Sequence, residues 1–188
     1  MKMIYLMRHG QDDENYIGGW SDGLLTNEGI DGVIETALWI KDNLEIKQII
    51  CSDISRARQT AMIVNKYLNV PIIYSDLLRE QNKGKLNGLL KEDVKRTSYK
   101  TYLKKVNINT VFPDGESLEN LYERVKSNIN YFMELSDNTL IITHRGVINM
   151  FYYILRNIPL DMDKKKFNVD VASVHALDKI TKSIKRIK

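Results

Sequence analysis

The sequence predicts an α/β fold, a three-layer α/β/α sandwich with a mostly parallel central sheet. Three observations support this prediction: short apolar runs of strand length recur, each leads into a polar or glycine-containing segment, and amphipathic helical patterns separate them. Strands that are apolar throughout are typical of a sheet covered on both faces. Long helical connections are what parallel strands need to be joined.

The first half of the chain alternates strands with helices. The elements expected in order are strand 3–7, a helix after Thr26, strand 48–51, helix 55–68 and strand 71–74. Thr26 can cap the first helix with its hydroxyl. The apolar stripe predicted for that helix comprises Ile30, Val33, Ile34, Ala37, Leu38 and Leu44.

The second half continues the alternation after a polar loop over residues 80–90 that contains two glycines. The elements expected after it are a lysine-rich surface helix over 91–105, a helix from the Ser117 cap to about Leu135, strand 140–143, helix 146–156 and terminal strands within 167–187 around a turn at Asp178-Lys179. No repeat, low-complexity tract or Pro/Gly/Ser linker divides the chain. A single domain over residues 1–188 is therefore expected.

Composition excludes several classes of protein. Fractions of 43% hydrophobic and 28% charged residues are those of a globular protein and exclude a mostly disordered, collagenous or coiled-coil chain. Cys51 is the only cysteine, so no intrachain disulfide can form and a cytoplasmic location is expected. The apolar start is too short for a signal peptide, and no run approaches the roughly 20 apolar residues of a membrane span. Neither export nor membrane association is expected.

The formal net charge of +4 is unevenly distributed. Residues 1–50 contain four basic and nine acidic side chains, so the basic excess lies in the remainder of the chain. This distribution is compatible with a nucleic-acid surface, with basic residues gathered around an anionic small molecule, or with a solvated basic face that has no partner. Composition leaves the three alternatives open.

Polar groups follow four of the predicted strands at the point where each strand ends. The segments are Arg8-His9-Gly10, Ser52 to Arg58, Arg79-Glu80 and His144-Arg145-Gly146. In sheets of this kind, ligands bind outside the carboxyl ends of the strands. Two histidines, several arginines and one carboxylate are therefore predicted to converge at one edge of the sheet.

These residue types together favour a phosphate site. Grouped arginines and imidazoles repel one another unless an anion lies between them, and the planar guanidinium matches phosphate oxygens. A helix beginning at Gly146 would direct its N-terminal amides at the same anion. Only Glu80 is a certain carboxylate at this edge and no P-loop sequence is present, so no metal is expected. A neutral imidazole can then be the nucleophile, and Glu80 can transfer protons if its pKa is raised.

Six motifs occur in order between about residues 3 and 175. They are Leu6-Met7-Arg8-His9-Gly10 with Asn15, Leu25-Thr26 with Gly29, Ser55 to Ala61, Leu78-Arg79-Glu80 with Gly84 and Gly88, Pro113 to Leu118, and Thr143 to Ile148. In this order they resemble the motifs of the histidine phosphatase superfamily, in its cofactor-dependent phosphoglycerate mutase-like branch. The resemblance implies the same three-layer fold that the periodicity predicts.

The resemblance also implies a catalytic role for five residues. His9 would be the phosphorylated nucleophile, and Arg8 and Arg56 would bind the phosphoryl group. Glu80 would be the proton donor and acceptor. His144 would be a second histidine in contact with the phosphoryl group.

Further contacts and departures concern the edges of the site. Asn15 would be another phosphate or substrate contact. Asp12 stands where the family often has threonine, which brings a carboxylate near the phosphate. Arg145 stands where a second glycine is common and could narrow the pocket or bind substrate. Lys83 and Lys85 could recognise a second anionic group or form a solvated basic loop.

We therefore expect a metal-independent phosphatase that hydrolyses phosphomonoesters of small metabolites through a phosphohistidine at His9, with no cofactor. Hydrolysis is favoured over phosphoglycerate mutase activity because the mutases of the family typically carry extra segments that shield the phosphoenzyme from water. The alternatives are such a mutase, which would use 2,3-bisphosphoglycerate, and a phosphate-ligand binding module without turnover. No nucleic-acid partner is expected. The substrate and the oligomeric state stay open.

Overall fold

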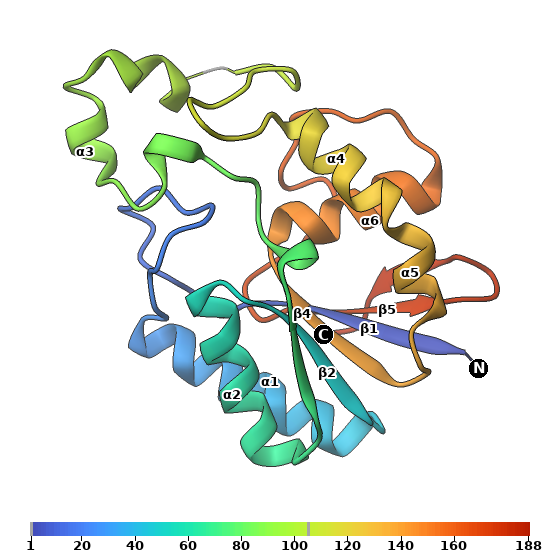
Figure 1. Cartoon of the computed structure of the whole chain (residues 1–188). Coiled ribbons are helices and arrows are strands. Elements are labelled where there is room, and N and C mark those ends of the chain that lie inside the picture. Colours follow the sequence, from blue (N-terminus) through green and yellow to red (C-terminus); the bar gives the residue numbers. More distant parts are fainter. Residues whose placement is uncertain (1, 105) are drawn as a thin grey trace.

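The computed structural model describes residues 2–104 and 106–188, which form a six-stranded sheet with helices on both faces (Figure 1). The strands are β1 (Met3–Arg8), β2 (Gln48–Ser52), β3 (Ile72–Ser75), β4 (Thr139–Thr143), β5 (Val174–Asp178) and β6 (Ile184–Arg186). Their order in the sheet is β3-β2-β4-β1-β5-β6. The pairs β3-β2, β2-β4 and β4-β1 are parallel, and β5 and β6 add an antiparallel edge. The predicted fold with a mostly parallel sheet is confirmed.

The helices divide between the two faces of the sheet (Figure 1). They are α1 (Asn27–Asn43), α2 (Ser55–Leu68), α3 (Lys91–Val94), α4 (Leu118–Ser127), α5 (Ile129–Glu134) and α6 (Arg145–Arg156). Leu140 and Ile142 of β4 pack with α1 and α2, whereas Ile141 packs with α4 and α6. Successive strand residues point to opposite faces. A strand that is apolar at every position can therefore support two hydrophobic cores.

The first helix begins where the sequence predicts, because the Thr26 hydroxyl accepts a hydrogen bond from the Gly29 N–H at 3.0 Å. The prediction that Leu38 belongs to the apolar stripe of this helix is wrong, because its side chain is 43% exposed. The stripe on this 17-residue helix is narrower than the sequence pattern indicates. Val33 and Ala37 of the predicted stripe face the sheet, together with Ile40, which the prediction did not include.

The predicted lysine-rich helix over 91–105 is only in part a helix. Its described residues form the single turn α3 and a 3-10 segment over Ser98–Leu103, and residue 105 lies outside the described residues. Val94 is the buried residue of α3, and the 3-10 segment buries none. Short helices in water depend on an apolar face that packs, so this segment has too little packing to continue as one helix.

The predicted helix from Ser117 to Leu135 is divided at Asn128. Ser117 caps α4 reciprocally with Asn120, as its position predicts. The Asn128 side chain donates to the Arg124 carbonyl at 2.8 Å, and its backbone leaves the helical region at φ −104° and ψ 5°. Side chains of this type compete with helical backbone hydrogen bonds. The chain resumes as the short helix α5.

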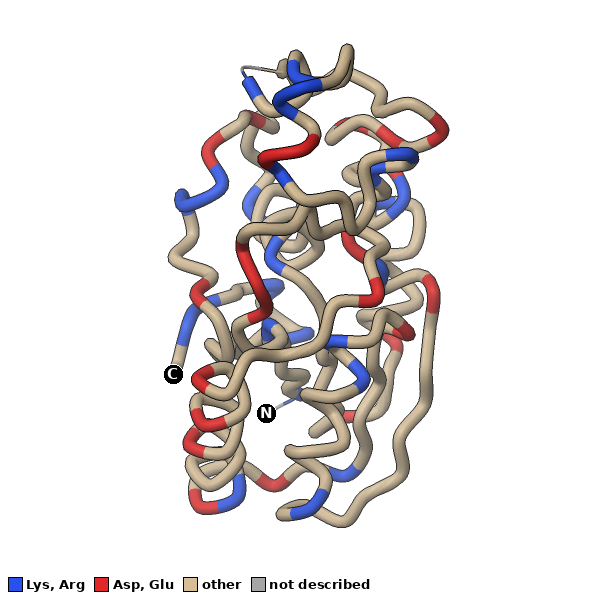
Figure 2. The backbone as a smooth tube through the Cα atoms, turned by 90° about the vertical axis from the view of Figure 1, so that its left-hand side faces the viewer, with Lys and Arg blue, Asp and Glu red and all other residues tan. Residues whose placement is uncertain are grey.

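The residues between β3 and α4 form a cap above the carboxyl end of the parallel strands (Figure 1). A small core holds this cap against the loop that follows β1, and its buried members are Ile17, Leu86, Val94 and Phe112. Lys, Arg, Asp and Glu occur over the whole height of the molecule in Figure 2, so neither sign of charge is confined to one end. In the part of the chain that the structure describes, no helix has the length and apolar character needed to cross a membrane.

Candidate active site

The carboxyl ends of β1, β4 and β2 bring the predicted site residues together. Arg8 at the end of β1 pairs in register with Thr143 at the end of β4, so His9 and His144 emerge side by side. Their ring centroids are 5.1 Å apart and the rings are inclined by 60°. Arg56, from the first turn of α2, places its Nε 3.1 Å from Nε2 of His9. Three residues separated in sequence thus form one cluster.

The loop after β1 is held tightly between α1 and α2. The Gly10 N–H donates to the Thr60 hydroxyl at 3.1 Å, and that hydroxyl donates to the Arg56 carbonyl at 2.8 Å. A Cβ atom on Gly10 would lie 2.6 Å from a methyl group of Val33. Only glycine permits this close approach. The position of His9 is thereby tied to the helix that carries Arg56.

The hydrogen bonds of His9 define its protonation state. Nδ1 donates to the Gly10 carbonyl at 2.6 Å, and Nε2 accepts from Nε of Arg56. The side chain is 4% exposed, and burial, together with the charges of Arg56 and the proximity of His144, lowers its pKa well below the ordinary value. His9 is therefore a neutral imidazole at neutral pH, with its lone pair on Nε2.

The guanidinium of Arg56 is buried and fixed at each nitrogen. It is 2% exposed, and it donates to the Ser21 hydroxyl at 3.2 Å and to the Gly19 carbonyl at 2.8 Å. The Asp12 carboxylate lies 3.5 Å from Nε, so the carboxylate expected near the phosphate site is present. Sequence reasoning did not identify Gly19 or Ser21, because no residue pattern marks them as contacts of α2.

Arg8 contributes a second cation with unused hydrogen-bonding capacity. One terminal nitrogen donates to the Val169 carbonyl at 3.0 Å, while its buried Nε has no hydrogen-bond partner among the described residues. Burial and the charge of Arg145 lower the pKa of Arg8 to about 10, so the group remains charged at neutral pH. A buried cation with a donor group that has no acceptor is suited to bind an anion.

His144 is fully buried, and a hydrogen bond with Ser52 at the end of β2 orients its ring. Its Nε2 lies 2.8 Å from the Ser52 hydroxyl, whose oxygen accepts from the Ile54 N–H at 3.4 Å. Nδ1 has no partner within the described residues. Burial and the charge of Arg56 lower the pKa of His144 well below its ordinary value, so the ring is neutral.

Glu80 reaches the site from the segment after β3, and the structure corrects the expectation of a raised pKa. Burial acts to raise the pKa, but hydrogen bonds from the backbone amides of Gln81 (2.9 Å) and Gly146 (3.1 Å), with the charges of Arg56 and Lys83, outweigh it. The pKa of Glu80 is therefore below its ordinary value. In the free site this carboxylate is ionised and is a base.

These groups line a cavity of about 780 Å³ between the sheet edge and the cap. Arg8, His9, Arg56, Glu80 and Arg145 all line it, whereas His144 lies behind the lining. The ionisable wall includes Lys83, Lys91 and Lys164.

The structure does not bring Asn15 into the cavity. Its exposed side chain donates to Asp13 at 2.9 Å, so the predicted substrate contact has no support. The described residues also contain no group of three or more His, Cys, Asp or Glu side chains arranged to hold a metal ion.

Comparison with known sequences identifies a family. The profile of the histidine phosphatase superfamily (branch 1) matches residues 4–185. A relative from Escherichia coli named "Probable phosphoglycerate mutase GpmB" is 31% identical over 169 residues, which cover 85% of this chain and 77% of the relative. A relative of the same name from Erwinia tasmaniensis is 27% identical over 175 residues, covering 88% and 80%.

Comparison with solved structures shows the same fold. The alpha-ribazole phosphatase from Shigella flexneri superposes with a TM-score of 0.81 at 22% identity, covering 98% of this chain and 94% of that one. A mycobacterial glucosyl-3-phosphoglycerate phosphatase superposes with a TM-score of 0.73 at 20% identity, covering 100% and 97%. At these identities the likeness concerns the fold.

Proposed function

Because the family profile spans residues 4–185, the chain belongs to the histidine phosphatase superfamily, and we propose that it hydrolyses phosphomonoesters through a phosphohistidine at Nε2 of His9. The observation that carries the proposal is the hydrogen bonding of His9. Gly10 holds the proton on Nδ1, and the Nε2 lone pair meets the Arg56 guanidinium in the cavity wall. A neutral nucleophile beside fixed positive charge suits attack on an anionic phosphoryl group.

The first step forms the phosphohistidine. Arg8 and Arg56 bind the phosphoryl oxygens, and the hydrogen bond from Nε of Arg56 to Nε2 of His9 breaks, so that the freed lone pair attacks phosphorus in line with the departing oxygen. His144 supports His9 from behind the cavity lining, with its ring centroid 5.1 Å away. The phosphorus–nitrogen bond forms as the bond to the alcohol oxygen breaks, and that oxygen takes a proton from Glu80. Glu80 takes this proton from solvent water when substrate enters, because the negative phosphoryl group raises the pKa of a neighbouring carboxylate.

The second step releases inorganic phosphate. Glu80, ionised again, takes a proton from a water molecule that attacks phosphorus, and the phosphorus–nitrogen bond breaks. The electron pair of that bond returns to Nε2 of His9. The lowered pKa of Glu80 keeps the carboxylate ionised before this step, so that it is able to accept the proton.

A phosphoglycerate mutase is the second candidate, because the two curated relatives carry that name. A mutase would return the phosphoryl group to an alcohol and would use 2,3-bisphosphoglycerate. We favour hydrolysis because a cavity of about 780 Å³ leaves room for water beside a phosphohistidine. No observation favours a binding module without turnover.

We propose the remaining properties on the same basis. Residues 1–188 act as a single domain, since the site groups come from one sheet and its covering segments. The partner is a small phosphorylated metabolite rather than a nucleic acid or a membrane, and no metal or cofactor takes part. Cys51 is free and buried, which suits the reducing cytoplasm.

The experiment combines a substrate panel with trapping of the intermediate. Purified protein is assayed in EDTA on phosphomonoesters, including both phosphoglycerates with and without 2,3-bisphosphoglycerate, and quenched samples are analysed by mass spectrometry for a phosphoryl group on His9. We expect hydrolysis in EDTA, labelled His9, and loss of both in His9→Ala. His175→Gln is the matched control, because His175 is a buried histidine that lies outside the cavity.

Each outcome separates the candidates. Interconversion of phosphoglycerates that is faster than hydrolysis of every panel member would favour the mutase. Full activity in a folded His9→Ala variant would reject the phosphohistidine.

A further inference from the structure

The cavity has a second cluster of cations beyond those that surround His9. Arg145, Lys83 and Lys164 line it from α6, from the segment after β3 and from the segment after α6. Among the described residues, no hydrogen bond or ion pair engages the side-chain cation of Arg145 or Lys164. The amine of Lys83 donates to the neutral side-chain oxygen of Gln81 and lies 4.1 Å from the ring centroid of Phe112. None of the three therefore has a carboxylate partner.

The three cations are close enough to influence one another. Desolvation, followed by the charge of Lys164, lowers the pKa of Lys83 to about 8. Lys164 is exposed to solvent at its place in the cavity wall. Partial desolvation, followed by the charge of Arg145, lowers its pKa. The charge of Arg145 also acts on Arg8. Repulsion between like charges destabilises an empty cavity of this kind, and a bound anion would relieve it.

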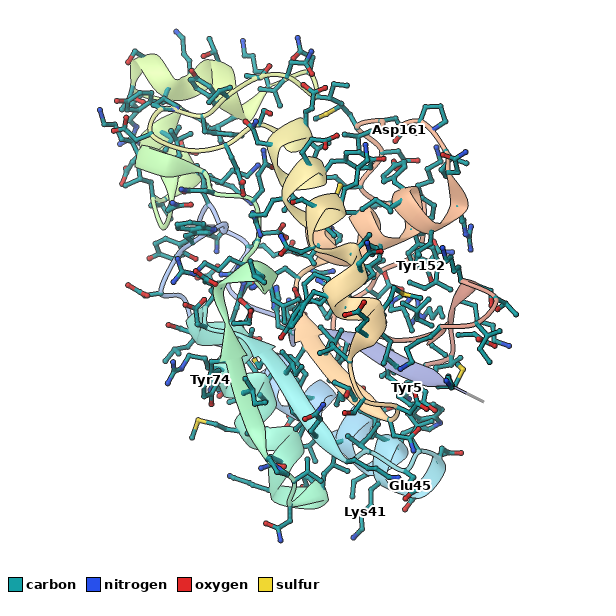
Figure 3. The ribbon with its side chains drawn as sticks, turned by 45° about the vertical axis from the view of Figure 1, so that its right-hand side comes forward. Tyr5, Lys41, Glu45, Tyr74, Tyr152 and Asp161 are labelled. Atoms are coloured by element: carbon teal, nitrogen blue, oxygen red, sulfur yellow. The ribbon has the colours of Figure 1, made fainter. Side chains whose placement is uncertain are left out.

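Three carboxylates of the cavity wall form hydrogen bonds or ion pairs with groups outside the cation cluster. Glu80 accepts two backbone hydrogen bonds, Asp12 lies beside Arg56, and Asp161 pairs with Lys166. Asp161, labelled in Figure 3, belongs to the segment after α6 and lines the cavity. The charge of Glu80 attracts Lys83 and Lys164, but among the described residues no ion pair joins a carboxylate of the cavity wall to Arg145, Lys83 or Lys164.

The location of Arg145 gives an independent reason to expect an anion. It is the first residue of the 12-residue helix α6, where the helix dipole disfavours a positive side chain. The neighbouring Gly146 amide already donates to Glu80. Glu80 is thus one negative group at this end of the helix, and its lone pairs are engaged by backbone amides, so it does not form an ion pair with Arg145.

We propose that Arg145, Lys164 and Lys83 form a second anion site, and that the substrates carry a second anionic group in addition to the phosphoryl group that reacts. This second group is a carboxylate or a further phosphate on the part of the molecule that leaves as the alcohol. The inference rests on the proposed phosphatase function, and it narrows the substrate class to phosphomonoesters with two anionic groups.

The test compares substrates that differ by one charge. The probes are 3-carboxyphenyl phosphate, its neutral isostere 3-carbamoylphenyl phosphate, and the corresponding bisphosphate, each measured as kcat/KM. We expect the wild type to prefer the carboxylate to the carboxamide by about tenfold or more, and the preference to shrink as salt is added. The bisphosphate distinguishes a site for phosphate from one for carboxylate.

Variants assign the preference to the three residues. Arg145→Gln, Lys164→Gln and Lys83→Gln should each reduce the ratio of the two kcat/KM values severalfold, and the ratio cancels any general loss of activity. Lys85→Gln is the matched control and should leave the ratio unchanged. Lys85 belongs to the same loop as Lys83, but it pairs with Asp114 and does not line the cavity.

A binding measurement separates this inference from the proposed function. Calorimetry compares the carboxylate and carboxamide forms of a benzylphosphonate, which cannot turn over. Turnover of both phosphates with equal kcat/KM overturns the anion site and leaves the phosphatase intact. Tighter binding of the charged phosphonate without turnover of any phosphate supports the anion site and rejects the phosphatase. A charge preference that survives in all three variants overturns the assignment to these residues.

Discussion

Lowering the pH from 8 to 6 should destabilise this protein through its three histidines. His9 is 4% exposed, and His144 and His175 are fully buried. Burial lowers the pKa of all three, that of His175 to about 4. In the unfolded chain each would titrate near 6.5. The unfolded state therefore binds protons below about pH 6.5 that the folded state does not bind, and the free energy of unfolding falls as the pH falls.

The magnitude follows from the linkage relation. At pH 6, each histidine of the unfolded chain is about three-quarters protonated, so unfolding takes up about 2.3 protons and the slope is about 3 kcal/mol per pH unit. Integrated from pH 8 to pH 6, the three residues together lower the free energy of unfolding by about 2.5 kcal/mol. The loss begins near pH 6.5 and continues to the folded-state pKa values. Carboxylates titrate below this window and contribute little to it, whereas Lys83, whose pKa is lowered to about 8, adds a smaller loss in the same direction near pH 8.

Urea unfolding at pH 8, 7 and 6 measures the effect. The buffers must lack phosphate, because an anion bound to the folded state would stabilise it. His175→Gln should remove about one third of the pH dependence, since it removes one of the three groups. A free energy of unfolding that is constant within about 0.5 kcal/mol from pH 8 to pH 6 would refute the reasoning, with an allowance of that size for fitting error. An NMR titration of His9 with a pKa near 6.5 would likewise show that the nucleophile is not held neutral by burial.

Three substitutions test the site and its frame. Gly146→Ala should reduce kcat by about tenfold or more, because the new Cβ would lie 2.0 Å from Oε1 of Glu80 and displace the carboxylate; unchanged kcat would show that Glu80 need not hold this position. Gly32→Ala in α1 meets no atom within 4 Å, so urea denaturation should show a gain of about 0.5–1 kcal/mol and kcat should not change. Arg56→Lys should lower kcat/KM by about 100-fold, because one ammonium cannot replace the three guanidinium nitrogens that donate to His9, Ser21 and Gly19; a loss below threefold would contradict a role for the guanidinium.

Much of the fold follows from local pattern. The apolar run Leu140-Ile141-Ile142 predicts β4, because a strand covered on both faces must be apolar at every position. Thr26 and Ser117 predict helix starts, because their hydroxyls satisfy free backbone amides nearby in the sequence. The helix predicted over 91–105 fails for the opposite reason. Its lysines are compatible with a helix, but only an apolar face packed against the rest of the protein could have stabilised a long one.

The amino-acid sequence is sufficient to predict which chemical groups meet. His9, Arg56 and His144 each lie at or just beyond the carboxyl end of a strand, and parallel strands bring those ends to a single edge whatever the details of packing. The protonation state of those groups depends on the three-dimensional packing around them. The pKa of Glu80 is lowered by amides of Gln81 and Gly146, and the tautomer of His9 is set by Gly10 and Arg56. Protonation depends on burial and on the direction of individual hydrogen bonds across a few ångströms, which a linear pattern of residue types does not contain.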